Sequence, residues 1–126
     1  MPWEITHLKD SNVLSIRVWG EVTVSTWQRQ VKESIERAQE LSCALYLVDY
    51  RDANMKMSFL DLFNRPQFYA EVGLSHAARI ALIFGEDYPE AGFIELVTGN
   101  RGYQVEVFSS QEAAIAWLTS TTEAAT

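Results

Sequence analysis

The sequence predicts an α/β fold built on a five-stranded mixed, mostly parallel sheet. Two short apolar runs, 44–48 and 80–84, lack the polar alternation of a half-exposed strand, and this predicts strands covered on both faces. Helical patterns lie between the successive predicted strands, which favours parallel pairing through right-handed crossovers. The exception is the first strand, which we expect to be antiparallel in an N-terminal hairpin.

The first half of the chain has the pattern of a hairpin, a helix and a buried strand. Residues 3–8 and 13–19 alternate in polarity, and the polar turn 10–12 joins them. A capping-box pattern that begins at Ser25 opens a helix with one apolar stripe. The buried strand 44–49 follows directly.

The second half repeats the alternation of helix and strand. Ser58 caps a short helix, and Pro66 interrupts the pattern where a second short helix begins. A buried strand is predicted at 79–84 and a last, alternating strand at 104–108. We expect one helix between these strands and one after them.

Length and composition predict a single domain. The chain has 126 residues, enough for one core without disulfide staples, and we assign residues 1–118 to it. The small, polar residues 119–126 are expected to form a flexible tail. Because the sequence shows neither a signal peptide nor about 20 consecutive apolar residues, we expect a cytoplasmic protein without membrane insertion.

The charge balance argues against nucleic acid as a partner. Seventeen acidic and ten basic residues give a net charge of −7, which repels phosphate backbones. The single cysteine, Cys43, lies beside a buried strand, where a thiol is usually part of the core.

Several short segments, taken in order, resemble the bacterial SpoIIAA-like family. They are 47–53 (LVDYRDA), 58–61 (SFLD), 79–81 (RIA), 100–103 (NRGY) and 107–108 (VF). The family is related to the STAS domains of sulfate transporters and anti-sigma-factor antagonists, and to the lipid-binding CRAL-TRIO domains.

The resemblance spans residues 3–118 and implies a β-α superhelix with helices mainly on one side of the sheet. Most members have no established biochemical function. Anti-sigma-factor antagonists have Asp-Ser-Ser-Gly after the central strand, with a serine that a partner kinase phosphorylates. Here the chain has DYRD at 49–52, so only Ser58 occupies a comparable helix start.

A charged edge follows the first buried strand. One interpretation is a binding site in which Arg51 holds an anionic group and Asp49 orients the arginine. The other is a structural ion pair, with Asp52 as a further acid in the loop. No histidine or cysteine lies nearby in sequence to complete a ligand set, so we expect neither a metal nor a cofactor.

Ser58 also allows two interpretations. Helix capping accounts for a serine at this place, and a phosphate would be tolerated at the same helix start. Ser58, His76 and Asp49 supply the residue types of a catalytic triad but no motif, so no enzyme is predicted.

The segment 59–72 carries more large apolar side chains than two short helices need. It predicts a dimer surface, the wall of an apolar ligand pocket, or a dense aromatic core. If helices cover only one face of the sheet, the centre of the other face is apolar and bare. We expect the helices around Pro66, or a second subunit, to cover it.

These observations favour a non-enzymatic regulatory or protein-interaction module of the STAS-like type that forms a homodimer. The alternative is a carrier of a small apolar or amphipathic, lipid-like ligand. The candidate binding residues are Asp49, Arg51, Asp52, Ser58, Phe63, Phe68 and Tyr69.

Overall fold

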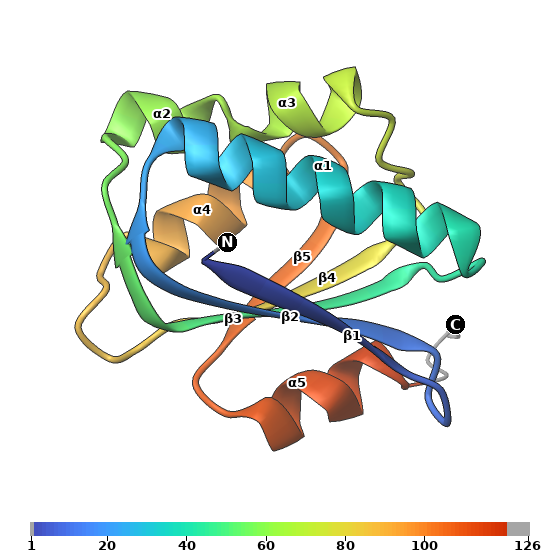
Figure 1. Ribbon diagram of the computed structural model, residues 1–126. Coiled ribbons are helices and arrows are strands. Elements are labelled where there is room, and N and C mark those ends of the chain that lie inside the picture. The colour runs from blue at the N-terminus through green and yellow to red at the C-terminus, as the bar shows by residue number, and fades with distance from the viewer. Residues whose placement is uncertain (1, 121–126) are drawn as a thin grey trace.

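A computed structural model describes residues 2–120, and its five strands form one sheet in the order β1-β2-β3-β4-β5 (Figure 1). β1 pairs antiparallel with β2 and every other pair is parallel, which confirms the predicted α/β class and the N-terminal hairpin. Residues 121–126 of the predicted tail lie outside the described residues. The strands are β1 (Trp3–Leu8), β2 (Val13–Val22), β3 (Leu45–Met55), β4 (Arg79–Ile83) and β5 (Gln104–Phe108).

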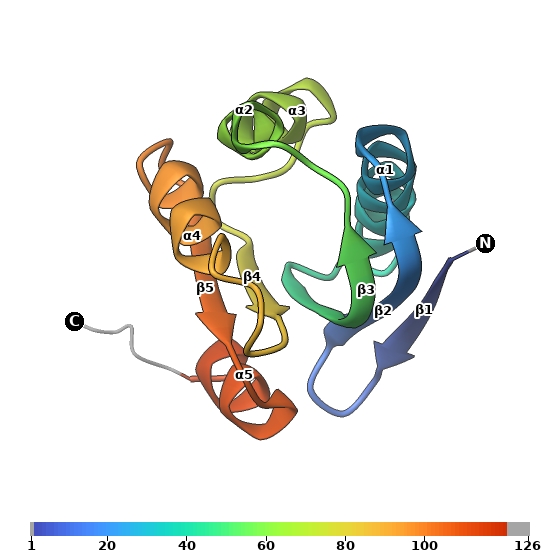
Figure 2. The same cartoon turned by 90° about the vertical axis from the view of Figure 1, so that its left-hand side faces the viewer.

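The helices divide unequally between the two faces of the sheet. Four of them lie on one side and α5 lies alone on the other (Figures 1 and 2). This arrangement agrees with the expected superhelix lined mainly on one side. The helices are α1 (Val24–Glu40), α2 (Phe59–Phe63), α3 (Arg65–Glu71), α4 (Ala91–Gly99) and α5 (Gln111–Leu118).

α1 starts earlier than the capping pattern at Ser25 predicts. Thr23 is the N-cap, and its hydroxyl accepts a hydrogen bond from the backbone of Thr26 at 3.3 Å. The reason is that β2 continues to Val22, three residues beyond its expected end, and the chain turns directly into the helix. The predicted apolar stripe is confirmed, because the core side of α1 buries Trp27, Val31, Ile35 and Ala38.

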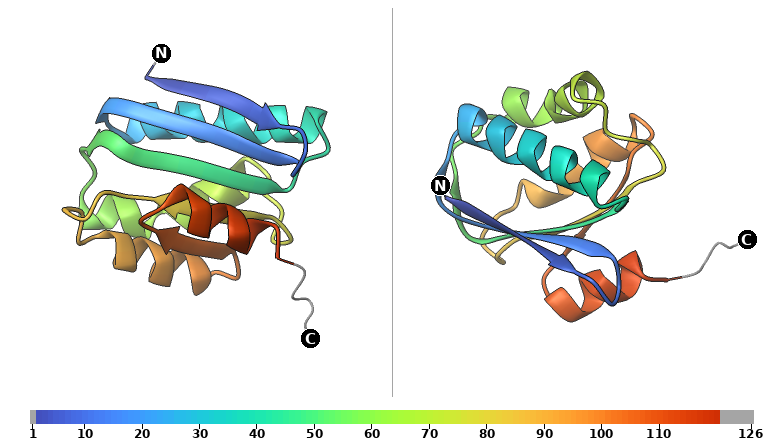
Figure 3. Two further views of the ribbon diagram at one scale, coloured as in Figure 1. Left: turned by 90° about the horizontal axis from the view of Figure 1, so that it is seen from below. Right: turned by 45° about the vertical axis from the view of Figure 1, so that its right-hand side comes forward.

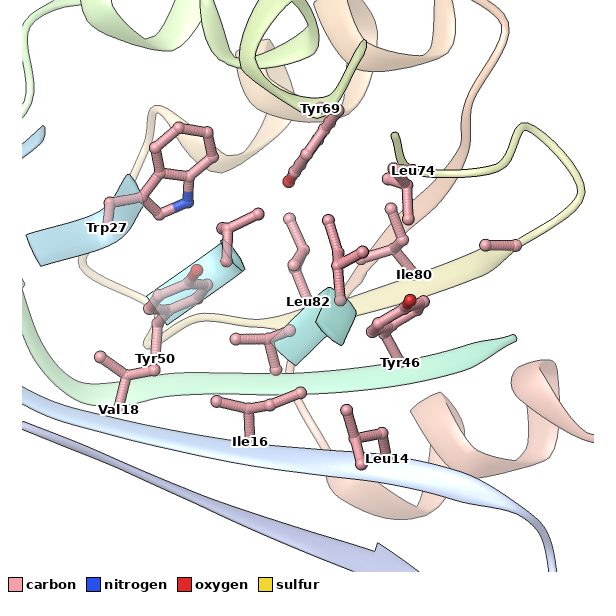
Figure 4. Packing of buried hydrophobic residues seen from close by; sticks show 14 of the residues in the cluster. Leu14, Ile16, Val18, Trp27, Tyr46, Tyr50, Tyr69, Leu74, Ile80 and Leu82 are labelled. Atoms are coloured by element: carbon pink, nitrogen blue, oxygen red, sulfur yellow. The ribbon is translucent and has the colours of Figure 1, made fainter. Parts of the chain in front are cut away.

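The main core lies between the sheet and α1 to α4. Alternate residues of each strand point into it, as the two-residue period of a strand requires. Figure 4 shows the central part of this core. The strand residues that contribute are Leu14, Ile16 and Val18 from β2, Tyr46, Val48 and Tyr50 from β3, and Ile80 and Leu82 from β4.

A second, smaller core lies on the opposite face, beneath α5. Ala114 and Leu118 of α5 cover Leu47, Ala81 and Ile83 of the central strands. The prediction that the helices around Pro66 or a second subunit cover this face was therefore wrong. After β5 the chain folds back under the sheet, and α5 covers β3, β4 and β5 (Figure 3). Val13 at the start of β2 and Leu8 at the end of β1 also join this core, and the rest of β1 and β2 is less covered on this face.

Arg79, the first residue of β4, forms hydrogen bonds with the C-terminal end of α5. Its Nη1 donates to the carbonyl oxygens of Trp117 at 2.9 Å and Ser120 at 3.0 Å. Its guanidinium also lies 5.7 Å from the centre of the Trp117 ring. A cation that hydrogen-bonds the last carbonyls of a helix satisfies groups that have no partner inside the helix.

At the β5 edge of the sheet, one backbone N–H group forms a hydrogen bond with a side chain. The N–H of Val107 donates to Oε2 of Glu95 at 2.8 Å. Glu95 belongs to α4, which packs against β5. The carboxylate therefore takes the place that a neighbouring strand would occupy.

Candidate functional site

The charged residues Asp49, Arg51 and Asp52 lie within β3 and not in a loop after it. The strand continues to Met55, six residues beyond the end that the sequence predicts. It does so because β2 is also longer and pairs with it, with a register shift between Arg17 and Trp19. The backbone positions of Asp49, Arg51 and Asp52 are thus fixed by the pairing of β3 with β2.

The guanidinium of Arg51 forms a bidentate pair with the carboxylate of Asp49. Its Nε donates to Oδ1 at 3.0 Å and its Nη2 to Oδ2 at 2.8 Å. The backbone N–H of Arg51 adds a third bond to Oδ1 at 3.0 Å. This bidentate geometry is the preferred one for arginine and carboxylate, and it favours the structural ion pair over a free anion-binding arginine.

The same pairing sets the pKa of the carboxyl group. Burial acts to raise the pKa of Asp49, but the hydrogen bonds and the charge of Arg51 outweigh it, so the pKa is lowered. Asp52 forms a second, exposed pair with Arg17, with Nη2 and Oδ2 3.0 Å apart. A binding role for these three residues stays a prediction.

Ser58 is the N-cap of α2, as the sequence predicts. Its hydroxyl accepts from the backbone N–H of Asp61 at 3.2 Å, and the Asp61 carboxylate accepts from the backbone N–H of Ser58 at 2.8 Å. These reciprocal bonds form a complete capping box. The side chain is exposed, so the position is accessible from solvent.

The exposed large apolar side chains of the described residues gather on α2 and α4. Phe59 is 61% exposed, Leu60 68% and Phe63 49% on α2, and Leu96 is 59% exposed on α4. The two helices touch, because the Phe59 ring meets the Phe93 ring edge-on at 5.2 Å. We call the surface formed by Phe59, Leu60, Phe63 and Leu96 the α2/α4 patch.

Phe68 and Tyr69, predicted with Phe63 as binding residues, lie apart from this patch. Phe68 is half-buried and packs on Trp27, with ring centres 5.4 Å apart. Tyr69 is buried and packs on Trp27 at 5.7 Å and on Tyr103 at 5.6 Å. The structure therefore divides segment 59–72 into an exposed part on α2 and an aromatic core under α3.

A buried arginine, Arg65, lies in this aromatic core. It is 1% exposed, and its Nη2 donates to the Tyr69 hydroxyl at 3.3 Å. Its guanidinium lies 4.7 Å from the centre of the Trp27 ring, a cation–π distance. Arg65 was not predicted as a site residue, although its spacing from Leu62 and Tyr69 places it on the buried stripe of a helix.

A groove of about 450 Å³ opens at the carboxyl ends of β3 and β4. Tyr50 stacks on Phe84 at 5.2 Å, and Phe84 packs on Tyr88 at 4.8 Å, so aromatic rings form one wall. Arg51, Asp87 and Glu90 supply charge at the groove. Its volume is within the range of small-molecule sites.

Ser58, His76 and Asp49, which have the residue types of a catalytic triad, do not lie together in the structure. His76 binds the carbonyl oxygen of Gly102 and stacks on Tyr103 before β4 begins. Asp49 pairs with the last residue of β4, at the other end of that strand. His76 and Asp49 are thus at opposite ends of the strands.

Residues 2–120 contain no group of three or more His, Cys, Asp or Glu side chains placed to hold a metal ion. None of their helices has the length and apolar character required to cross a bilayer.

The sheet order, the single antiparallel strand and the one-sided helical cover define a SpoIIAA-like fold. A crystal structure with this fold is similar to the chain over 92% of its length, with a TM-score of 0.61 and 18% sequence identity. It is an uncharacterized protein of the DUF3478 family from Shewanella loihica PV-4, of which 91% is covered. The predicted SpoIIAA-like fold is confirmed. No family model and no curated protein matches the sequence.

Proposed function

We propose that the protein is a non-enzymatic interaction module of the STAS-like type that binds a regulatory protein through the α2/α4 patch. The observation that carries this proposal is that the four exposed large apolar side chains of the described residues lie on two helices that touch, α2 and α4. Apolar side chains scattered singly are ordinary, whereas a cluster of them is typical of a contact surface.

The size of the patch favours a transient partner over an obligate one. Four side chains exposed by 49–68% present roughly 400 Å² of apolar surface. A stable interface buries about 800 Å² on each partner, and an obligate dimer more. The net charge of −7 also makes two copies of this chain repel each other, so we favour a second, basic protein over a homodimer.

Ser58 would give such a module a means of regulation. It caps the helix that carries three residues of the patch, and it is exposed. A phosphate on this hydroxyl would add close to two negative charges beside the apolar surface. A partner that docks on the patch would bind the modified protein with a different affinity.

Carriage of a lipid inside the main core has less support. A cavity in the main core, lined by Tyr46, Tyr50, Tyr69 and neighbouring aliphatic residues, has a volume of about 30 Å³. This space suits a single water molecule and excludes an acyl chain.

A photo-crosslinking amino acid at position 60 tests the proposal. We expect it to trap one protein, which is then purified and titrated against the wild type and two variants. Leu60→Lys places a charge in the patch and should weaken binding at least about tenfold. Ala116→Lys adds the same charge on α5, across the sheet, and should leave binding unchanged.

Two results would contradict the proposal. One is a trapped partner that binds the Leu60→Lys variant as tightly as the wild type. The other is a crosslink only to a second copy of this chain, together with a mass by light scattering that doubles with concentration in the wild type but not in the Leu60→Lys variant. The second result would establish the homodimer instead.

A further inference from the structure

Arg65 has hydrogen-bond donors that no described residue accepts from. A guanidinium carries five N–H groups. Within residues 2–120 its Nη2 donates to the Tyr69 hydroxyl, and the guanidinium also has a hydrogen-bonding contact with the Tyr50 hydroxyl, but its Nε and Nη1 are buried without a partner. Buried donors of this kind are rare, because each costs free energy when it leaves water.

The charge of Arg65 is also unbalanced. The ion pairs of the described residues are Arg17–Asp52 and Arg51–Asp49, and both lie outside the core. The groups that act on the Arg65 guanidinium are the hydroxyls of Tyr69, Tyr50 and Tyr88. Burial raises the pKa of Tyr50 to about 12, so this neighbour is neutral at physiological pH. A buried cation without an anion is strongly unfavourable.

Two further polar groups near Arg65 lack a partner. They are the indole Nε1 of Trp27, whose ring lies under the guanidinium, and the hydroxyl of Tyr88. Of the five buried side-chain atoms without a partner in the described residues, four belong to this cluster. The nitrogens of Arg65 and Trp27 can only donate. The missing group is therefore an acceptor, and the unbalanced charge requires it to be an anion. Figure 4 shows Trp27, Tyr50 and Tyr69 approaching this region from α1, β3 and α3.

We propose that Arg65, Trp27 and Tyr88 form a binding site for the carboxylate of a small organic acid. One guanidinium balances one negative charge, and its planar fork matches a carboxylate. No second cation acts on the site among the described residues, so only one of the two negative charges of a phosphate dianion would be neutralised. The aromatic rings around the charge suit an acid with an aromatic or apolar body. This site is separate from the protein contact on the α2/α4 patch.

The groove at the ends of β3 and β4 gives the acid a route to Arg65. Tyr50 and Tyr88 line this groove and also interact with the Arg65 charge from the other side. Tyr88 lies in the turn between β4 and α4, outside any helix or strand. Rotation of its side chain would join the groove to the guanidinium, with the body of the acid in the groove.

Titration of the ¹⁵N-labelled protein with sodium benzoate, octanoate, acetate and phosphate tests the site. The readout is the indole N–H resonance of Trp27, assigned with a Trp27→Phe variant. We expect benzoate or octanoate to shift it with saturation and to bind at least about tenfold more tightly than phosphate. Arg65→Met should lose this binding by at least about tenfold and Tyr88→Phe by about threefold. Arg17→Met removes a surface arginine and should bind like the wild type.

Several outcomes would overturn the site. One is the absence of a saturable shift with any carboxylate at about 10 mM in the wild type, which corresponds to negligible affinity. Phosphate binding as tight as benzoate binding would reject the carboxylate, and unchanged binding by folded Arg65→Met would reject Arg65. If Arg65→Met does not fold, unchanged binding by Tyr88→Phe rejects the proposal. Leu60→Lys should bind the acid normally, which separates this test from that of the protein contact.

Discussion

The Nη2 atom of Arg65 donates to the hydroxyl of Tyr69, 3.3 Å away and one turn further along α3. Tyr69→Phe removes this acceptor and leaves another buried guanidinium donor without a partner. We expect the free energy of unfolding to fall by about 1–3 kcal/mol. Urea denaturation measures it. Repeating the change in an Arg65→Met background should cost close to nothing, and an equal loss in both backgrounds would show that the hydroxyl acts independently of Arg65.

Arg65→Met alone should raise the stability of the protein in carboxylate-free buffer. The substitution loses a cation–π contact of about 2 kcal/mol but removes a buried unpaired charge whose desolvation costs several kcal/mol. Urea denaturation of this variant and of Arg17→Met, its surface control, gives the comparison. A large loss of stability for Arg65→Met would mean that the arginine holds the core together.

Alkaline pH should destabilise the protein through its buried tyrosines. Burial raises the pKa of Tyr46 and that of Tyr50 to about 12 each, so the folded state favours the neutral phenols. The unfolded chain loses these protons near pH 10. The stability that the neutral phenols contribute is therefore complete below pH 10 and is lost as the pH rises towards 12.

Tyrosinate absorbance and urea midpoints between pH 9 and 12 measure this effect. Tyr50→Phe should lose less stability than the wild type over the same interval. If all tyrosines titrate near pH 10 while the protein stays folded, the phenols of Tyr46 and Tyr50 are not protected by burial.

Ser58→Ala should destabilise the protein by about 1 kcal/mol, because it removes the hydroxyl that caps α2. Ser58→Asp should keep the stability, since aspartate caps as well as serine. Thermal unfolding of both variants measures this. Ser110→Ala, at the equivalent cap of α5, is the matched control and should cost a similar amount. A Ser58→Asp variant as unstable as Ser58→Ala would show that capping is not the role of the side chain.

Arg79→Met should loosen α5 before the rest of the fold. The variant loses the hydrogen bonds from Nη1 to the carbonyl oxygens of Trp117 and Ser120. Bonds from a charged donor contribute about 1.5–3 kcal/mol each. Hydrogen exchange should quicken in α5 while α1 keeps its protection. Uniform quickening in both helices would contradict a local role.

The sheet was predictable because its signals are local and repeated. The apolar runs that became β3 and β4 predicted strands covered on both faces, and the short hairpin turn predicted the antiparallel pair. The position of α5 was not predictable, because its short apolar stripe fits either face of the sheet. Only packing reveals that Leu118 covers Leu47 and Ala81.

The candidate site was predictable only in part. The capping box at Ser58 follows from residue types three apart, and the structure has it. The charged edge was located correctly, but the pairing of Arg51 with Asp49 depends on side-chain direction within β3. Arg65 was missed because a charged residue is assumed to face water, whereas its helical spacing from Tyr69 puts it inside.

The bond from the Val107 amide to Glu95 has a consequence for solubility. A sheet that ends in a bare ladder can recruit strands from other molecules and grow into fibrils, and the Glu95 carboxylate occupies a hydrogen-bonding position on that outer rim. Glu95 thus blocks the addition of another strand at this position of the β5 edge, which protects the protein from polymerisation.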